Sequence, residues 1–264
     1  DICVKSLRQV VTATSDGALA ATELEKYVAK IQRKTGIRTK DPVIREKAVV
    51  KKVAEKRTKD IGHFSPEMRA QLETVFERME NSLVLKLYLD EGALSRELKE
   101  YIETLVAMTD KLTMEEVQEK NEEFLPCVKL YREDDSYTGL AFHGVPGGHE
   151  FTSFVLGLYN AAGPGQMVED NLKKRIQSIN KSVDIKILVT LSCSMCPDLV
   201  IAAQHMAVIG AHITTEIFDV SHFEALRKKY KVMSVPCMVI NDKHVFFGKR
   251  GMQEVIEIVE NCIK

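Results

Sequence analysis

Two cysteines three positions apart, Cys193 and Cys196, are the residues whose type and spacing most clearly permit chemistry in this sequence. They follow the apolar run IKILVTL and precede Pro197, a residue favoured in the first turn of a helix. A strand ending before Cys193 and a helix beginning at Cys196 or Pro197 would place the Cys193 sulfur over free backbone N–H groups. This position favours the thiolate, the form that attacks a disulfide, and Cys196 would lie close enough to resolve the mixed disulfide.

Two other interpretations of the pair remain open. A zinc site needs four ligands, and the further candidates in this half of the chain are Cys237, His205, His212, His222 and His244. A structural disulfide across so short a loop would constrain the unfolded chain little. Redox exchange is favoured because Val235 and Pro236, forty residues after Cys196, precede a predicted hairpin, an arrangement typical of thioredoxin folds.

The elements around the pair form a repeat. FLPCVKL, beginning at Phe124, and SVPCMVI, beginning at Ser234, each place a Pro-Cys pair before a strand and a hairpin, and the proline there predicts a cis bond or a sheet edge. The first copy is predicted to contain a helix from Ser65, a strand at 83–89, a helix at 94–108, a strand near 129, a turn at 134–135, a strand to 142 and a helix at 150–160. The second is predicted to contain helices at 167–179, 197–209, 222–230 and 252–263, strands at 184–191, 213–218, after 236 and at 245–247, and a turn at 241–242.

The first copy is predicted to be redox-silent. Aligning LKLYLDEGAL with LVTLSCSMC places Glu91 and Leu94 where the second copy has its cysteines. Cys127, after Pro126, is interpreted as a buried strand residue, and so is Cys237.

Disulfide exchange benefits from a proton acceptor near the resolving thiol. The strand before Cys193 contains no carboxylate at 185–189, so an acid would have to come from the other copy. Glu150 begins the otherwise apolar helix of GGHEFTSFVLGLY. From the residues alone, the simpler interpretation of Glu150 is an acid favoured by the helix dipole.

Composition limits the function classes. The chain has 264 residues, 45% of them hydrophobic, with 37 basic against 38 acidic residues, which predicts a globular protein and favours neither nucleic acid nor a membrane as partner. The order of the predicted helices and strands indicates an α/β fold. Six cysteines are too few for a disulfide scaffold, so we expect a reducing, cytoplasmic location. The first residue is Asp1 rather than Met, and we expect the chain to be a fragment of a longer protein.

The sequence from about Ser65 to Lys264 resembles a known family. The segments FHGVPGGHEFTSFVLGLYNAAGPGQ, SCSMCPDLV and VMSVPCMVINDKHVFFGKRGMQEVIEIV are similar to the tandem thioredoxin-fold (glutaredoxin-like) module of the alkyl hydroperoxide reductase flavoprotein subunit. The resemblance implies two thioredoxin folds, each a helix followed by a βαβαββα-like unit, at 64–164 without a cysteine pair and at 165–264 with the redox pair. It also implies that Glu150 is the acid near the disulfide and that Pro236 shapes the binding surface. The Ser194-Met195 dipeptide departs from the polar pair usual in the family.

Residues 1–33 resemble the C-terminal end of thioredoxin reductase-like FAD domains, in which an aspartate, an Arg-Gln pair and a small-residue helix face the flavin. Asp1, Arg8 and Gln9 match those positions, and this resemblance implies FAD contacts only in a full-length parent. A charged segment at 34–63 is interpreted as a linker. We expect no cofactor in this chain alone, and FAD with NAD(P)H in a parent enzyme that is a homodimer.

Taken together, the residues and the resemblances predict a disulfide oxidoreductase. A flavin-domain dithiol would reduce Cys193 and Cys196, which would pass the electrons to a peroxiredoxin or thioredoxin-like acceptor in peroxide detoxification or redox homeostasis. The alternative is a non-catalytic tandem thioredoxin-like adaptor that binds a partner or holds zinc.

Overall fold

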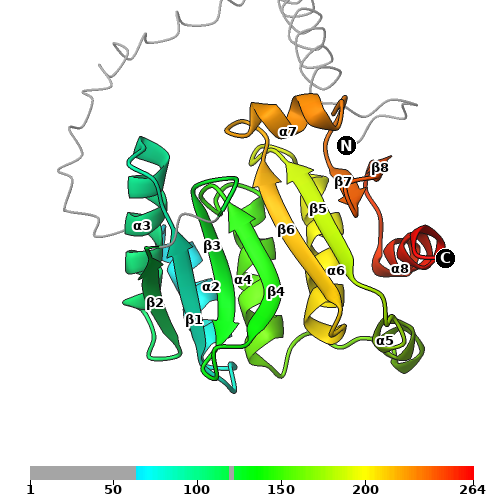
Figure 1. The fold of residues 1–264 in the computed structure, drawn as a ribbon. Helices are drawn as coiled ribbons and strands as arrows, with labels where there is room; N and C mark the ends of the chain where they lie inside the picture. Colours follow the sequence, from blue (N-terminus) through cyan, green and yellow to red (C-terminus); the bar gives the residue numbers. More distant parts are fainter. Residues whose placement is uncertain (1–63, 119–121) are drawn as a thin grey trace, which may run out of the picture. The chain divides into compact units, whose positions relative to one another are not determined.

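The computed structural model describes residues 64–118 and 122–264. Eight strands in this part of the chain form one mixed sheet in the order β2-β1-β3-β4-β6-β5-β7-β8 (Figure 1). The strands are β1 (Leu83–Tyr88), β2 (Leu112–Val117), β3 (Cys127–Arg132), β4 (Tyr137–His143), β5 (Val183–Val189), β6 (Ile213–Asp219), β7 (Cys237–Ile240) and β8 (His244–Phe247). The helices are α2 (Pro66–Phe76), α3 (Ala93–Val106), α4 (Glu150–Ala162), α5 (Asp170–Gln177), α6 (Cys196–Ile209), α7 (Glu224–Lys229) and α8 (Met252–Cys262).

The sheet repeats one strand order twice. β1 pairs parallel with β2 and antiparallel with β3, which pairs antiparallel with β4. β5 pairs in the same way with β6 and β7, and β7 with β8. The two copies are joined by parallel pairing of β4 with β6, from Leu140 opposite Thr215 to His143 opposite Phe218. The prediction of two copies of one α/β plan is therefore confirmed, and the two copies share a continuous sheet.

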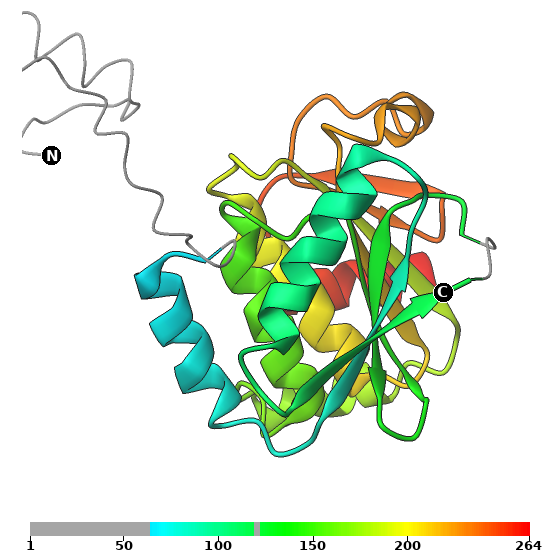
Figure 2. The ribbon, with the colours of Figure 1, turned by 90° about the vertical axis from the view of Figure 1, so that its left-hand side faces the viewer.

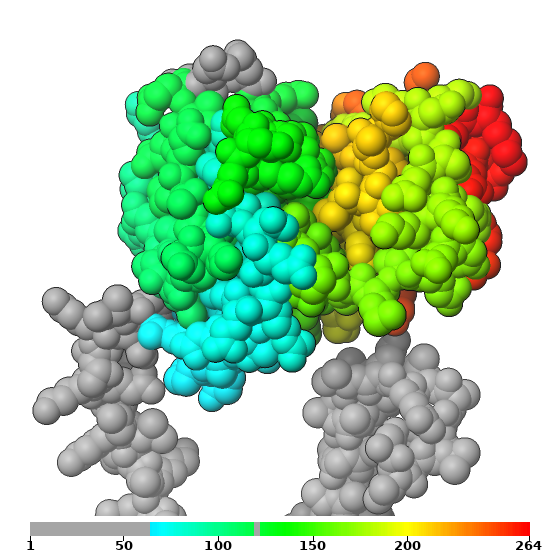
Figure 3. All heavy atoms as spheres, turned by 90° about the horizontal axis from the view of Figure 1, so that it is seen from below, coloured from blue at the N-terminus to red at the C-terminus, as the bar shows by residue number. Residues whose placement is uncertain are grey.

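One face of this sheet is covered by helices. Figures 1 and 2 show α2, α4 and α6 packed on the same side. The cause is the alternation of side chains along each strand: in β5, Ile185 and Ile187 join the helix-covered core, whereas Lys186 points to the opposite face and is only half-buried. Seen from below, the two halves lie side by side (Figure 3).

Helix α7 packs on the other face, at the end of the sheet. Its Leu226 joins Leu188 of β5 and Phe218 of β6 in a second, smaller core. In the first half, the described residues between β2 and β3 contain no helix, so this copy lacks one helix of the βαβαββα-like unit that the resemblance implies, and it has a strand, β2, that the residue pattern did not predict. The connection is short and polar, with the sequence QEKNEEFLP at 118–126.

Most element boundaries agree with the sequence-based expectations within a few residues. The Ser65 hydroxyl accepts a hydrogen bond from the Met68 N–H at 3.3 Å and caps α2, with Pro66 as first residue. Helix α5 begins at Asp170, three residues later than predicted, after a fully exposed Met167. None of the helices in the described ranges has the length and apolar character that a bilayer crossing requires.

Candidate functional site

Cys193 and Cys196 form a disulfide at the start of α6. Cys196 is the first residue of the helix, and the two Cα atoms are 5.6 Å apart. The Cys193 N–H donates to the Thr190 carbonyl at 2.9 Å, which closes a turn directly after β5. Cys196 is 0% exposed, whereas Cys193 is only partly buried. The predicted strand–pair–helix arrangement is therefore present, and Cys193 is the member of the pair that another protein can reach.

Pro236 lies at the same end of the strands as the disulfide. The register of β5 with β7 places Leu188 opposite Cys237, so Pro236 comes level with Val189, four residues before Cys193. The Val235–Pro236 bond is cis, as is Leu125–Pro126 at the corresponding place in the first copy. Both prolines were predicted to have a cis bond or to lie at a sheet edge, and the cis alternative is confirmed.

A loop from the first copy holds the segment that precedes the disulfide. The His149 N–H donates to the Leu191 carbonyl at 2.9 Å. Gly148 has a φ of +55°, and a Cβ built there would lie 2.4 Å from the same carbonyl oxygen, so only glycine fits. The Gly147-Gly148 pair is a sequence signal of close backbone approach, but no local pattern indicates that its partner is the Leu191 carbonyl.

Glu150, the first residue of α4, is fully buried. Its Oε2 accepts a hydrogen bond from the Ser153 hydroxyl, while Oε1 has no hydrogen-bond partner among the described residues. Burial raises the pKa of Glu150 to about 7, and the Ser153 hydrogen bond opposes this shift only in part. A carboxyl group with this pKa can both accept and release a proton near neutral pH.

Glu150 comes level with the disulfide because α4 and α6 run side by side in the same direction. Helix α4 follows β4 and helix α6 follows β5. These two strands run in the same direction, so both helices begin at the same end of the sheet, where the strands finish. A Cβ built on Gly157 would lie 3.1 Å from the Gln204 side chain. Gly157 is seven residues beyond Glu150, and Gln204 is eight beyond Cys196. At about 1.5 Å per residue, Glu150 and Cys196 differ in height by only about 1.5 Å.

Two of the three other described cysteines are buried away from solvent, whereas Cys262, near the end of α8, is partly exposed. Cys127 and Cys237 are 0% exposed, and burial raises the pKa of both thiols, that of Cys237 to about 11. This agrees with their interpretation as buried strand residues. No group of three or more His, Cys, Asp or Glu side chains in the described part of the chain could hold a metal ion.

The corresponding turn of the first copy has no cysteine. When α3 and α6 are aligned at their first residues, Asp90 and Ala93 stand at the positions of the pair, one residue before the expected Glu91 and Leu94. The Asp90 carboxylate accepts from the Ser95 hydroxyl at 2.5 Å. Asp1, Arg8 and Gln9, the expected flavin contacts, lie outside the described residues.

Comparison with known proteins places this geometry in context. A family model for the thioredoxin domain matches residues 183–260. The chain is 36% identical to the crystal structure of the NTD_N/C domain of alkylhydroperoxide reductase AhpF from Enterococcus faecalis, with a TM-score of 0.71, over 74% of this chain and 99% of that one.

Two curated relatives match a similar part of this chain. An alkyl hydroperoxide reductase component of Pseudomonas aeruginosa is 28% identical over 193 residues, covering 73% of this chain. An NADH dehydrogenase from Bacillus subtilis is 29% identical over 189 residues, covering 72%. In both cases the match spans 36% of the relative's own length.

Proposed function

The chain belongs to the family of the AhpF NTD_N/C domain, a module of tandem thioredoxin folds, and from this premise we propose that it relays electrons between protein disulfides. The observation that supports the proposal most strongly is the Cys193–Cys196 disulfide at the N-terminus of α6; the buried Glu150 begins the neighbouring helix α4. We also propose that the two folds extend over 64–164 and 165–264. Residues 1–33 are proposed to be a flavin-domain remnant, and 34–63 a linker.

In the reduced chain, the Cys193 thiolate attacks one sulfur of the acceptor disulfide. A sulfur–sulfur bond forms between Cys193 and the acceptor while the acceptor's own disulfide breaks, and the second acceptor sulfur leaves as a thiolate. Cys196 then attacks Cys193, which restores the intramolecular disulfide and releases the acceptor as a dithiol. Two electrons pass to the acceptor, and the two protons that its dithiol takes up equal the two that Cys193 and Cys196 lose.

Glu150 is the proposed proton carrier for Cys196. The buried thiol must lose its proton before it can attack, and the ionised Glu150 carboxylate is the acceptor level with it. Because the pKa of Glu150 is raised to about 7, both protonation states are populated at neutral pH. Pro236, at the same end of the strands as the disulfide, is proposed to shape the surface that receives the acceptor.

The electrons are proposed to come from the dithiol of a thioredoxin reductase-like domain that contains FAD and oxidises NAD(P)H. A peroxiredoxin or a thioredoxin-like protein is the proposed acceptor, and the parent enzyme is proposed to be a cytoplasmic homodimer. Named relatives support a peroxide-reductase assignment for the module. The flavin contacts proposed for Asp1, Arg8 and Gln9 fall outside the described residues.

The experiment is a reconstitution with metal analysis. The oxidised chain is mixed with a reduced thioredoxin reductase-like flavoprotein, and NAD(P)H oxidation is followed with a peroxiredoxin and peroxide present. We expect Cys193 and Cys196 to cycle, as measured by thiol titration. A pair that the reduced flavoprotein leaves oxidised, or stoichiometric zinc on the isolated chain, would favour the adaptor alternative instead.

A further inference from the structure

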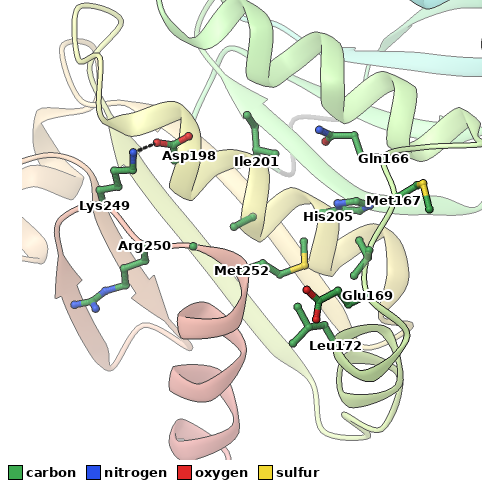
Figure 4. A pocket seen from close by; sticks show the side chains of 13 residues that line it. Gln166, Met167, Glu169, Leu172, Asp198, Ile201, His205, Lys249, Arg250 and Met252 are labelled. Atoms are coloured by element: carbon green, nitrogen blue, oxygen red, sulfur yellow. Dashed lines mark ion pairs between the residues drawn. The ribbon is translucent and has the colours of Figure 1, made fainter.

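A groove runs beside the disulfide-bearing helix. Its cavity of about 490 Å³ lies between α6, the start of α8 and the segment that leads into α5 (Figure 4). Its walls are largely apolar, formed by Met167, Leu172, Ile201 and Met252. Volume and lining are those of a site for a bulky apolar group rather than for a simple ion.

A buried histidine without a partner lies in this groove. His205 is only 6% exposed, and its ring nitrogens make no hydrogen bond to the described residues. Figure 4 shows the ring projecting from α6 towards the segment of Met167. Burial lowers the pKa of His205, so the ring is neutral at pH 7, with one donor and one acceptor nitrogen. The ring nitrogens are not sealed from the groove, so a hydroxyl group that enters it can form a hydrogen bond with His205.

The groove is continuous with the disulfide through α6. Asp198, two residues after Cys196, lines its upper end and forms an ion pair with Lys249 across the groove (Figure 4). His205 lies nine residues beyond Cys196, a distance of about 13.5 Å along the helix axis. Cys193, which the partner reaches, precedes Cys196, so an extended polypeptide bonded to Cys193 needs at least about four residues to cover the distance to His205.

We propose that this groove is the anchor site for the acceptor polypeptide and takes a tyrosine side chain about four residues from the acceptor's disulfide cysteine. The proposal rests on the proposed function and specifies its partner. The ring would lie between the apolar walls, and the phenol hydroxyl would meet His205. A hydroxyl fits either tautomer, because it donates and accepts. An anionic head group fits less well, because Asp198 and Lys249 already neutralise each other, Glu169 lies at the groove and Arg250 points away from it (Figure 4).

The flexible side chain of Met167 supports a partner on this surface. It is 101% exposed, and with Met195 and Met233 it is one of three exposed large apolar side chains among the described residues. A methionine at a binding surface can adjust its shape to an incoming ring. Met167 also lines the neighbouring cavity with His205, so the apolar surface extends along α6.

The test uses four synthetic peptides, each with one internal disulfide. Three have tyrosine, phenylalanine or alanine four residues from the cysteine, and the fourth has its tyrosine ten residues away. The chain is reduced with dithiothreitol, desalted and mixed with each peptide below saturation, and thiol loss is followed by alkylation and mass spectrometry. We expect the first peptide to react more than about tenfold faster than the alanine peptide and about fivefold faster than the phenylalanine peptide.

His205→Leu is the informative variant, because it removes the hydrogen bond and keeps an apolar side chain. It should abolish the preference for tyrosine over phenylalanine but keep the preference for phenylalanine over alanine. His212→Leu, at an exposed histidine outside the groove, is the matched control and should behave as the unmodified chain.

Equal rates for the tyrosine and alanine peptides, or a tyrosine preference that survives His205→Leu, would refute the anchor site. A separate titration calorimetry measurement uses the tyrosine peptide with both cysteines replaced by serine. If none of the four disulfide peptides is reduced but the serine-substituted peptide still binds in a His205-dependent manner, the anchor site stands and the proposed electron transfer is wrong. If it does not bind, the anchor site is wrong as well.

Discussion

Replacing Glu150 by glutamine should make the protein more stable at alkaline pH than the unmodified chain. Burial raises the pKa of Glu150 from 4.5 to about 7, so between these values the folded protein keeps a proton that the unfolded chain has lost. The contribution of this group to stability is therefore fully present below about pH 4.5 and is lost as the pH rises through 7. Glutamine has the same shape and does not titrate, so its contribution is independent of pH.

The magnitude follows from the two pKa values. Linkage gives a loss of roughly 0.8 kcal/mol by pH 5 and roughly 3.3 kcal/mol by pH 8, a difference of about 2.5 kcal/mol. The amide leaves its own unpaired polar atoms in the same buried place, but that cost is constant and cancels when two pH values are compared. The Ser153 hydrogen bond is retained as a contact to the amide oxygen in both conditions.

The assay is urea unfolding of the oxidised protein at pH 5 and pH 8. The free energy of unfolding of Glu150→Gln minus that of the unmodified chain should rise by about 2.5 kcal/mol between the two pH values. Glu91→Gln, at an exposed carboxyl group of the cysteine-free copy, is the control. If the difference for Glu150→Gln is the same at both pH values, the buried carboxyl group does not hold a proton at neutral pH, and its role as proton carrier loses its physical basis.

Two further predictions concern the surroundings of the disulfide. Gly148→Ala should destabilise the fold by at least about 3 kcal/mol, because its Cβ would meet the Leu191 carbonyl. Gly248→Ala, also at positive φ but with open space around it, should cost only about 1 kcal/mol. Thermal unfolding measures both variants, and similar losses of stability would contradict the close contact. Iodoacetamide at pH 8 should modify Cys193 of the reduced native chain and leave Cys237 unmodified until denaturant is added, because burial raises the pKa of Cys237 to about 11. Peptide mapping identifies the modified cysteines. Modification of Cys237 without denaturant would mean that its strand opens readily and would contradict the prediction.

Sequence periodicity predicted the buried strands well and the solvated edge poorly. In β5, apolar residues first alternate with polar ones and then form a continuous apolar run, and the predicted ends of this strand lie within two residues of the observed ones. The strand β2 was missed because it is an edge strand whose sequence LTMEEV contains two exposed glutamates, so its apolar alternation is weak. Its pairing with β1, which no local pattern encodes, determines that it is a strand.

The candidate site divides in the same way. Cys193 and Cys196 could be found from spacing alone, because their function depends on neighbours within one helical turn. Glu150 could not, since its position level with Cys196 results from the parallel pairing of β4 with β6, a contact between residues more than seventy positions apart. The residues alone favoured a dipole-placed acid, whereas its complete burial and its unpaired oxygen appear only in the structure.

The most direct test of the electron relay is the reaction of reduced protein with the aromatic disulfide DTNB, in a background with Cys3 and Cys262 replaced by serine. We expect the unmodified pair to release two equivalents of thionitrobenzoate, the first when Cys193 attacks and the second when Cys196 resolves the adduct. Cys196→Ser should release one equivalent and keep the second as a stable adduct on Cys193, and Cys193→Ser should react slowly. A Cys193→Ser protein that reacts as fast as the unmodified pair, or a Cys196→Ser protein that retains no adduct, would contradict the assigned roles.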